Sequence, residues 1–518
     1  MIIQFRCERD HARRWMCRET LPINGRDIPV QFAWTAATEA RPAGLEALFT
    51  LERMVLRKGK AGGADKLNEI PQQSQAQLDQ ADVVVDFTTA ERDPASAAKL
   101  CLRPMFNGAA GENAALAAIL AGDLPVIEIV NERDGTVIDR GHPSAEIAAG
   151  LSGGLDTVMA RTLSMLAAAL SGAPRLVPQL VYSAGSPRKP APYVLRGVVT
   201  SIAKEIYRLC CYAPHWHVGW RYNNNADVWQ TRDLSGPAWN VLADPGNRFY
   251  ADPFPVTWQG RTCLFFEDLD HRVGKGIISA IEFDGKGPVG EVFPVLEEPW
   301  HLSYPFLIEQ NGELWMIPES TEHRDVPLYK CVRFPDKWER HATLLSGLEL
   351  ADVTITQHNG LYYMFGAWRD GTGGYSDTLA IYYAQQLFGP WQPHASNPIL
   401  MDRATTRPAG NFVTIDGRLW RPVQDCTNGY GAALGLAEIL DLSPTTYSQA
   451  VRHLLKPGPL WNGRKLHTLN RCGSLEVIDG SRVQPKTTAL LNRFRSAGKS
   501  PQPQWSGAMA KPVAERQR

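Results

Sequence analysis

One repeated pattern constrains the fold of this chain more than any other feature. Four segments reach a glycine turn in the same way, with a distinctive residue, an apolar strand, and then a glycine eight residues after the first residue. These segments are residues 252–260, 304–312, 352–360 and 409–417. A second apolar strand follows each glycine, over residues 262–267, 314–319, 361–368 and 419–424. The unit recurs about every 50 residues, which predicts the blades of a β-propeller rather than a sandwich.

A fifth blade is expected near the end of the repeat region. It begins near His467 and continues over residues 474–478. The strand at residues 216–221 precedes the first blade, and we expect it to close the ring. The sequence therefore predicts a five-bladed, all-β propeller over residues 214–484.

Two carboxylates open inner strands of this propeller. Because the first strand of each blade lines the central channel, Asp252 of blade one and Asp352 of blade three are expected to face one axial pocket. Two carboxylates across a sugar-sized pocket suit glycoside chemistry, and both are predicted to be catalytic. The alternative is structural, since an aspartate at the start of a strand also caps a turn.

Further polar and aromatic side chains are expected around the same pocket, because sugar sites combine polar groups with aromatic platforms. The predicted substrate-binding residues are His301, Ser303, Tyr304, Glu319, Trp368, Arg407, Asp425 and His467. A metal ion at the axis is an open alternative for such Asp, His and Glu side chains, but their spacing gives it no support. We therefore expect neither a metal nor a cofactor.

The start of blade one resembles family 43 glycoside hydrolases. Residues 251–255 (ADPFP) are followed by a glycine turn and by the run LFFE at residues 264–267. The resemblance implies that Asp252 is the general base and that Asp352 modulates the pKa of the general acid. The family's acid is a glutamate that opens blade four, where this sequence has TRPAG at residues 406–410. A hydrolase without that proton donor loses a large rate factor, so ordinary glycosidase activity is in doubt.

Five further runs resemble the propeller domain of plant glucosamine inositolphosphorylceramide transferases, a domain that bacterial proteins also carry. The runs are YADPFP (250–255), EPWHLSYPF (298–306), MIPES (316–320), RPVQDC (421–426) and HTLN (467–470). The resemblance covers roughly residues 214–483 and implies a glycan-related role. The transferase domain of the plant enzymes is separate, and no segment of this chain resembles it.

Residues 1–172 are predicted to form an α/β domain with a parallel sheet. Apolar strands are expected at residues 28–33, 81–87 and 125–130, and helices at residues 113–120 and 155–170. Strands that alternate with helices favour parallel pairing.

The stretch 81–141 resembles the N-terminal domain of formyltransferases. Residues 82–86 match a strand of that family, residues 102–111 its glycine-rich helix start, and Asp134 its aspartate. Residues 103–107 replace the family's loop with the catalytic Asn and His, and the only histidines of residues 1–172 are His11 and His142. Formyl transfer needs a positioned acid or base, so we interpret this domain as degenerate.

Residues 173–213 are predicted to link the two domains. A linker rich in Pro, Ser and Arg is followed by an amphipathic helix at residues 193–212. Its apolar face comprises Leu195, Val198, Val199, Ile202, Ile206 and Leu209, and its charged side chains include Arg196, Lys204 and Arg208. We expect this helix to pack on the propeller; the alternative is peripheral contact with a membrane or a partner. Residues 485–518 are polar and basic and are expected to be disordered.

Composition narrows the class of partner. The 54 basic and 54 acidic residues balance, which gives no indication of a nucleic acid partner. The nine cysteines include no C-x-x-C pair, and no apolar stretch is long enough to span a membrane. Residues 1–10 lack the apolar run of a signal peptide, so we expect a cytoplasmic protein.

The leading hypothesis is a carbohydrate-active enzyme, transferase or hydrolase, that makes or modifies a bacterial glycoconjugate at the axial pocket. One alternative is a non-catalytic sugar-binding or scaffold module. The other is a formyltransferase that acts on an amino sugar.

Overall fold

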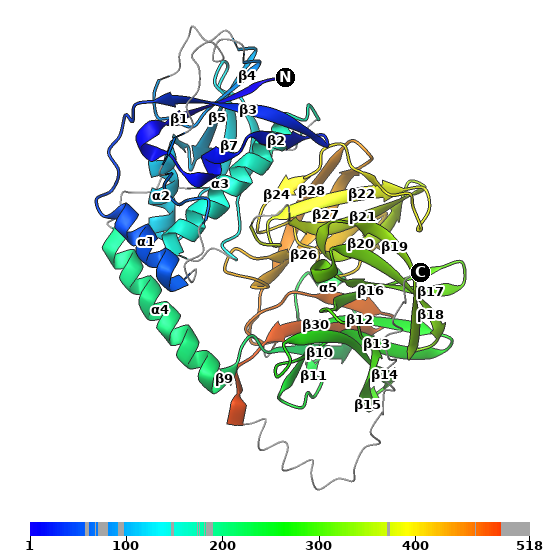
Figure 1. The fold of residues 1–518 in the computed structure, drawn as a ribbon. Coiled ribbons are helices and arrows are strands. Elements are labelled where there is room, and N and C mark those ends of the chain that lie inside the picture. Colours follow the sequence, from blue (N-terminus) through cyan, green and yellow to red (C-terminus); the bar gives the residue numbers. More distant parts are fainter. Residues whose placement is uncertain are drawn as a thin grey trace, which may run out of the picture.

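The chain folds into an α/β domain and a β-propeller, with a long helix along one edge of the molecule (Figure 1). The computed structural model describes residues 1–56, 62–67, 69–70, 81–91, 98–146, 150–173, 175, 177–180, 182, 190–369, 373–461 and 463–487. Residues 174, 176, 181 and 183–189 of the predicted linker and residues 488–518 of the predicted disordered tail therefore lie outside the described residues.

The N-terminal domain is built on one curled sheet. Its strands are β1 (Ile3–Glu8), β2 (Thr20–Ile23), β3 (Arg26–Thr35), β4 (Val83–Asp86), β5 (Leu100–Phe106), β6 (Ala109–Ala110), β7 (Ile127–Asn131) and β8 (Val137–Gly141). The order is β2-β3-β1-β4-β5-β7-β8, with β6 paired to β5. The predicted parallel sheet is confirmed at its centre, where β3, β1, β4 and β5 run parallel. The flanking strands β2, β7 and β8 pair antiparallel.

Three helices accompany this sheet: α1 (Leu45–Leu56), α2 (Glu112–Ala121) and α3 (Gly150–Ala169). The helices predicted at 113–120 and 155–170 correspond to α2 and α3. Helix α3 begins earlier than its apolar pattern, because the Glu52 carboxylate of α1 accepts hydrogen bonds from the backbone N–H groups of Leu151 and Ser152 at 2.9 and 2.8 Å. These bonds satisfy amide groups that a helix start leaves unpaired. The α3 side chains Leu155 and Val158 are fully buried in the core of the domain.

The C-terminal domain is a five-bladed propeller. Blade one comprises β12 (Arg248–Trp258), β13 (Arg261–Asp270), β14 (Lys275–Asp284) and β15 (Gly287–Leu296). Blade two comprises β16 (Ser303–Gln310), β17 (Glu313–Glu319), β18 (Asp325–Arg333) and β19 (Lys337–Ser346). Blade three comprises β20 (Glu349–His358), β21 (Leu361–Arg369), β22 (Thr378–Ala384), β23 (Gln392–Pro393) and β24 (Leu400–Met401). Blade four comprises β25 (Val413–Ile415), β26 (Arg418–Asp425), β27 (Ala433–Leu442) and β28 (Tyr447–Leu455).

Blade five closes the ring with strands from both ends of the propeller sequence. Strands β29 (Leu469–Cys472) and β30 (Leu475–Ser481) pair with β10 (Trp216–Tyr222) and β11 (Asn240–Val241) in the order β11-β10-β30-β29. Strand β10 runs antiparallel to β30. The predicted role of the strand at residues 216–221 in closing the ring is confirmed.

The distinctive residue of the repeat occupies a strained position in the first three blades. Asp252, Tyr304 and Asp352 have φ values of 51°, 43° and 54°. The pairing register shifts beside each of them, so each lies in a β-bulge of its inner strand. A bulge bends the strand and redirects a side chain, and the left-handed backbone costs about 1–3 kcal/mol. The repeat therefore marks positions where the fold tolerates strain near the propeller axis.

The linking helix α4 (Pro190–Cys210) does not pack on the propeller as predicted. It leads into β9 (Cys211–Tyr212), which pairs with β31 (Gln484–Pro485) beside the propeller. All six predicted apolar side chains of α4 are exposed. Among the described residues, no helix is both long and apolar enough to cross a membrane.

The two domains share a polar and partly apolar interface. Arg161 of α3 forms a fully buried ion pair with Asp377 of the propeller, with an Nη2–Oδ1 distance of 2.7 Å. Asp377 also accepts a hydrogen bond from the Ser144 backbone at 2.8 Å. The Met401 side chain of blade three packs into the core of the N-terminal domain. The N-terminal domain is thus fixed against blade three.

Candidate active site at the propeller axis

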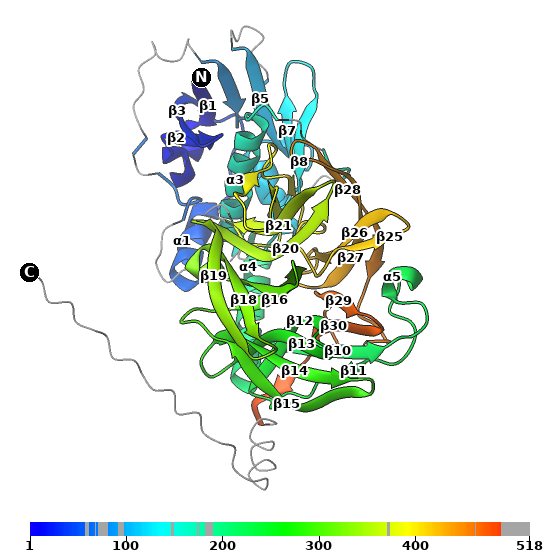
Figure 2. The ribbon, with the colours of Figure 1, turned by 90° about the vertical axis from the view of Figure 1, so that its right-hand side faces the viewer.

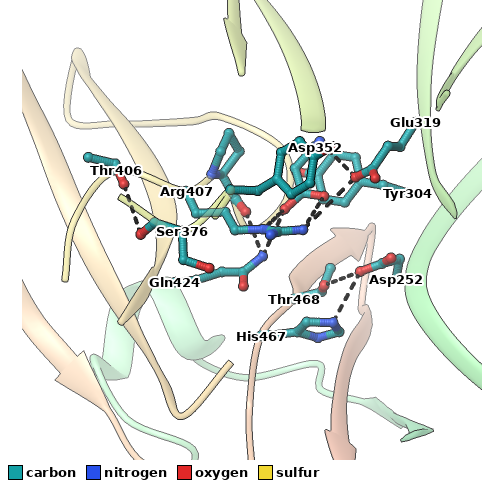
Figure 3. Close-up of polar contacts among 12 residues, drawn as sticks. Asp252, Tyr304, Glu319, Asp352, Ser376, Thr406, Arg407, Gln424, His467 and Thr468 are labelled. Carbon is teal, nitrogen blue, oxygen red and sulfur yellow. Dashed lines mark hydrogen bonds and ion pairs between the residues drawn. The ribbon is translucent and has the colours of Figure 1, made fainter. Parts of the chain in front are cut away.

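Two groups of buried polar side chains meet near the propeller axis (Figure 3). The Asp252 half contains Asp252, His467, Thr468 and Asp479. The Asp352 half contains Glu319, Asp352, Arg407 and Gln424. Asp252 and Asp352 are only 4 % and 2 % exposed. The charge of Asp352 helps to raise the pKa of both Asp252 and His467. The structure therefore brings the two predicted catalytic residues into one region.

The Asp252 half is joined by hydrogen bonds from blades one and five. The Asp252 carboxylate accepts a hydrogen bond from the Thr468 hydroxyl at 3.0 Å, and its oxygen lies 3.5 Å from His467 Nε2. The other ring nitrogen, His467 Nδ1, lies 2.5 Å from an Asp479 carboxylate oxygen. Asp479 also accepts a hydrogen bond from the Asp252 backbone N–H at 2.8 Å. The His467 ring is stacked on Trp216 at 4.0 Å between ring centroids, which fixes its plane.

Burial makes the Asp252 carboxyl hold its proton more tightly than an ordinary aspartate does. It raises the pKa of Asp252 to about 7, although the neighbouring His467 opposes this shift. The pKa of His467 is also raised, because the attraction of Asp479 and Asp252 outweighs the effect of burial. A carboxyl group and an imidazole that lie next to each other, both with raised pKa values, can exchange a proton.

Asp252, His467 and Asp479 also meet a minimum requirement for a metal site. Among the described residues, they form a group in which one ligand atom from each lies within 4.8 Å of the others. The Nδ1 atom of His467 is already hydrogen-bonded to Asp479, and Asp252 already accepts from Thr468. The three side chains thus satisfy one another, and the site needs no ion to hold it together.

The Asp352 half is organised by an arginine. Arg407 donates from Nε to Asp352 Oδ2 at 2.6 Å and from Nη2 to Oδ1 at 3.3 Å, a two-point ion pair. Gln424 donates a third hydrogen bond to Asp352, at 2.9 Å. The Glu319 carboxylate accepts from the Asp352 backbone N–H at 3.2 Å. The Arg407 guanidinium lies over the Tyr430 ring, 4.7 Å from its centroid.

Burial raises the pKa of Asp352 to about 7 as well; Arg407 opposes this shift, and Glu319 adds to it. Burial opposes the charge of Arg407, but Asp352, Tyr430, Glu146 and Glu319 together outweigh it and raise the pKa of Arg407 well above its usual value. The positive charge beside Asp352 is therefore permanent. Arg407 stands at the start of blade four, in the segment where the resemblance to family 43 glycoside hydrolases led us to look for a glutamate.

The N-terminal domain approaches the Asp352 half. Thr406, next to Arg407, donates to the Ser376 carbonyl at 3.3 Å, and the Ser376 hydroxyl donates to Glu146 of the N-terminal domain at 2.7 Å. The charge of Glu146 contributes to the raised pKa of Arg407. The interface between the domains and the axial site are thus neighbours.

A third buried carboxyl lies beside the site, on the second strand of blade one. Glu267 is 7 % exposed, and burial together with Asp252 and other carboxylates raises its pKa well above the usual value. Its Oε1 atom lies 3.4 Å from Nε2 of His301, whose Nδ1 accepts a hydrogen bond from the Gly276 backbone at 2.9 Å. Burial lowers the pKa of His301. His301 is therefore linked to the site through Glu267.

Four other predicted substrate-binding residues have local partners. The Tyr304 hydroxyl is fully buried; it lies 2.8 Å from the Thr354 hydroxyl and accepts from the Gly410 backbone at 2.7 Å. Ser303 pairs with Glu319 across the blade-two hairpin. Trp368 packs against the core of blades two and three. Asp425 accepts from the Thr427 backbone at 2.9 Å and so caps a turn.

Sequence reasoning missed three residues of the site. Asp479 and Glu476 are two acids inside the apolar strand LEVID, and acids on a buried strand were an available signal. Gln424 lies in the run RPVQDC, again as a polar residue on a buried strand. Thr468 follows His467 directly, but nothing in its own sequence context marks it.

In the N-terminal domain, Asp134 and the two histidines, His11 and His142, each have separate local partners. Asp134 uses its carboxylate to accept a hydrogen bond from the Thr136 backbone at 2.9 Å and so closes its own turn. His11 lies 2.6 Å from Glu8, and His142 lies 3.0 Å from the Leu124 carbonyl near the domain interface. Neither histidine is found with Asp134. The formyltransferase resemblance is not confirmed and stays a prediction.

The fold and the site define a five-bladed β-propeller with buried carboxyl groups at its axis. Residues 238–478 match the family model described as glucosamine inositolphosphorylceramide transferase 1, N-terminal. This match confirms the resemblance predicted for the propeller.

Curated relatives give the same result. The glucosamine inositolphosphorylceramide transferase 1 of Arabidopsis thaliana is 32 % identical over 280 residues, which are 50 % of this chain and 36 % of the relative. Its counterpart from Oryza sativa subsp. japonica is 30 % identical over 295 residues, or 54 % of this chain and 39 % of the relative. The chain thus spans little more than a third of the length of these relatives.

Solved structures with a similar propeller include a family 117 glycoside hydrolase from Zobellia galactanivorans, with 9 % identity and a TM-score of 0.35 over 51 % of this chain and 90 % of that one. A family 43 protein from Bacillus licheniformis has 16 % identity and a TM-score of 0.32 over 41 % of this chain and 48 % of that one. The family match agrees with a carbohydrate-related function.

Proposed function

We propose that the axial site binds a sugar of a glycoconjugate and that Asp252 acts there as a general base. The observation that carries this proposal is the contact of Asp252, whose pKa is about 7, with the His467–Asp479 pair. A general base works best when its pKa lies near the operating pH. His467 and Asp479 are positioning residues, since they orient and polarise the group that meets the substrate.

The chemistry available to this site favours transfer over hydrolysis of an alkyl glycoside. Asp252 can accept the proton of an attacking hydroxyl while that oxygen forms a bond to the sugar carbon. The leaving group must then depart with the electrons of the broken bond. An alcohol needs a proton to do so, whereas a phosphate leaves as a stable anion. Arg407 stands in the segment where the resemblance to family 43 glycoside hydrolases predicts the acid, and a guanidinium does not give up a proton.

The substrate class rests on the relatives. Those that match are named as glucosamine inositolphosphorylceramide transferases, so we infer a glycoconjugate as substrate. The bacterial setting and the cytoplasmic location predicted from the sequence belong to the same proposal.

A specific observation favours a second function. Asp352 is held by Arg407 and Gln424, and no carboxylate opens blade four. A site whose second carboxylate is occupied in this way fits a non-catalytic sugar-binding module. Under this alternative, Asp252 would accept hydrogen bonds from a sugar but would not move a proton.

Thermal-shift binding against pentoses, hexosamines, nucleotide sugars and folates tests both functions. We expect a sugar to stabilise the wild-type protein and Asp252→Ala to lose that shift. Asp252→Asn then separates the two functions, because it removes turnover under the first and only weakens binding under the second. A shift given by folates alone would contradict both functions and move the site to the N-terminal domain.

A further inference from the structure

Helix α4 carries an apolar stripe that the described part of the protein leaves exposed. The stripe comprises Leu195, Val198, Val199, Ile202, Ile206 and Leu209, whose side chains are 43–75 % exposed. These positions are three, four, seven, eleven and fourteen residues from the first, so they follow the helical period and share one side. A stripe of this kind normally faces a core, a partner or a lipid surface.

The helix is held at its ends and exposed between them. At its start, Tyr193 packs against the core of the N-terminal domain and lies within electrostatic reach of Glu52 on α1. At its end, the chain passes into β9, which is fixed by its pairing with β31. Figure 1 shows α4 running along the outer edge of the molecule between these two anchors. Because both ends of α4 are held, its apolar stripe is available to a binding surface without any change in the fold.

The end of α1 extends this apolar surface. Leu51, Met54, Val55 and Leu56 are 37–62 % exposed. The electrostatic interaction between Glu52 and Tyr193 places this part of α1 near the start of α4, and Figure 1 shows the two helices side by side. Two neighbouring helices therefore expose large apolar side chains.

The polar side of α4 is basic. Arg196, Lys204 and Arg208 are exposed, and Glu205 is its only acidic residue. Lys486 adds a further positive charge, since its ammonium group donates to the Arg208 carbonyl at 2.6 Å. The sequence that follows, residues 488–518, contains six basic residues and one acidic residue. An anionic surface complements this charge.

We infer that the stripe of α4 binds the surface of an anionic lipid bilayer, with the helix lying in the plane of the interface. A basic amphipathic helix with exposed aliphatic side chains has the composition of such interfacial helices, and α4 is not apolar enough to span the bilayer. The basic tail is a poor cover for the stripe, because its charges and the basic side chains of α4 repel each other. A second copy would likewise bring equal charges together. This inference is independent of the function proposed for the axial site.

Vesicle flotation of the full chain tests the inference. The probes are vesicles of phosphatidylcholine alone and vesicles that also contain phosphatidylglycerol. We expect binding to the anionic vesicles that weakens with salt. Ile202→Gln/Ile206→Gln should reduce it at least about tenfold, because it removes apolar side chains from the interface. Arg196→Gln/Lys204→Gln/Arg208→Gln should reduce it by roughly fivefold for each charge removed.

The matched control is Thr200→Gln, which changes an exposed residue outside the stripe and should bind as the wild type does. All of these positions are exposed, so circular dichroism and melting temperature should stay unchanged. Failure of the wild type to float, or equal flotation of the wild type and both multiple variants, would overturn the inference. So would a dimer in sedimentation that Ile202→Gln/Ile206→Gln dissociates, or binding that needs deletion of residues 488–518.

Discussion

Asp252 and Asp352 occupy equivalent places in their blades, yet they have different partners. Each opens an inner strand in a bulge with a left-handed backbone, each is buried, and burial raises the pKa of each to about 7. Asp352 faces Arg407, whose charge is permanent. Asp252 faces His467, a titratable group whose pKa is raised by the attraction of Asp479 and Asp252. The partner, and not the repeat position, decides what each carboxyl group can do.

This difference separates two roles within one buried site. A permanent cation fixes the position and the charge of Asp352, which suits structure and ligand orientation. A titratable partner allows a proton to move on and off Asp252, which suits acid–base chemistry. The following changes test this distinction, beginning with the largest expected effect.

Asp252→Asn should lower turnover of a sugar substrate by about 10²–10⁴-fold, because the amide cannot accept the proton. The Thr468 hydroxyl can still donate to the amide oxygen, so the fold should be retained. Steady-state kinetics with the sugar identified by binding measures this effect. Asp425→Asn is the matched control, since Asp425 caps a turn at the end of β26. Turnover within a few-fold of the wild type in Asp252→Asn would remove the base role.

Arg407→Met should lower the free energy of unfolding by about 3–5 kcal/mol, because it leaves the buried Asp352 carboxylate without its cation. The double variant Asp352→Asn/Arg407→Met should recover much of this loss, since no buried charge remains. Urea denaturation of the wild type and the variants gives the three values. A double variant as unstable as Arg407→Met would show that the ion pair is not the cause.

The raised pKa values in the Asp252 half also predict how the stability of the protein depends on pH. Folding raises the pKa of Asp252 from 3.8 to about 7, so the folded state binds this proton more tightly than the unfolded state does. The contribution of Asp252 to stability is therefore fully present below about pH 4 and is lost as the pH rises through about 7. His467, whose pKa is also raised, acts in the same direction above its ordinary value of 6.5.

Thermal melts of the wild type and Asp252→Asn at about pH 5 and about pH 8 check this sign. We expect the melting temperature of the variant to gain on that of the wild type as the pH rises. Asp425→Asn should show no such trend. An equal difference at both pH values would contradict the raised pKa.

Tyr304→Phe should have the smallest effect, a loss of about 1–3 kcal/mol in the free energy of unfolding. The change removes the acceptor for the buried Gly410 N–H and a partner of the Thr354 hydroxyl. Sugar binding should persist, because the Tyr304 hydroxyl bonds to protein groups, the Thr354 hydroxyl of blade three and the Gly410 backbone next to blade four. Loss of the sugar-dependent thermal shift with an unchanged melting temperature would instead give Tyr304 the substrate-binding role predicted from the sequence.

The sequence contained enough information for the blades and for the strained positions near the axis. The repeat placed Asp252 and Asp352 correctly, because the glycine turn and the bulge lie at a fixed spacing along one hairpin. The partners of these residues come from distant strands. Asp252 and Asp479 are 227 residues apart, and Asp352 and Arg407 are 55 apart. Local patterns do not report such contacts, so the division of the site into two halves was not predictable.

The helix at residues 190–210 illustrates the same limit. Its amphipathic period predicted the helix, and α4 confirms it. The period shows that one face is apolar but does not identify what covers that face. The sheet of the N-terminal domain is similar: its strands β3, β4 and β7 were predicted, but the antiparallel pairing of β7 with β5 and of β8 with β7 depends on chain connections that alternation alone does not fix.

The central claim is that Asp252 exchanges a proton with His467 near neutral pH. Isotope-edited infrared titration of the aspartate carboxyl groups, with Asp252→Asn as the reference, measures this directly. The account predicts that the carboxyl band missing from Asp252→Asn titrates at about pH 7 and that His467→Gln shifts its midpoint. A band that titrates near the ordinary aspartate value of about 4, unchanged by His467→Gln, would contradict it.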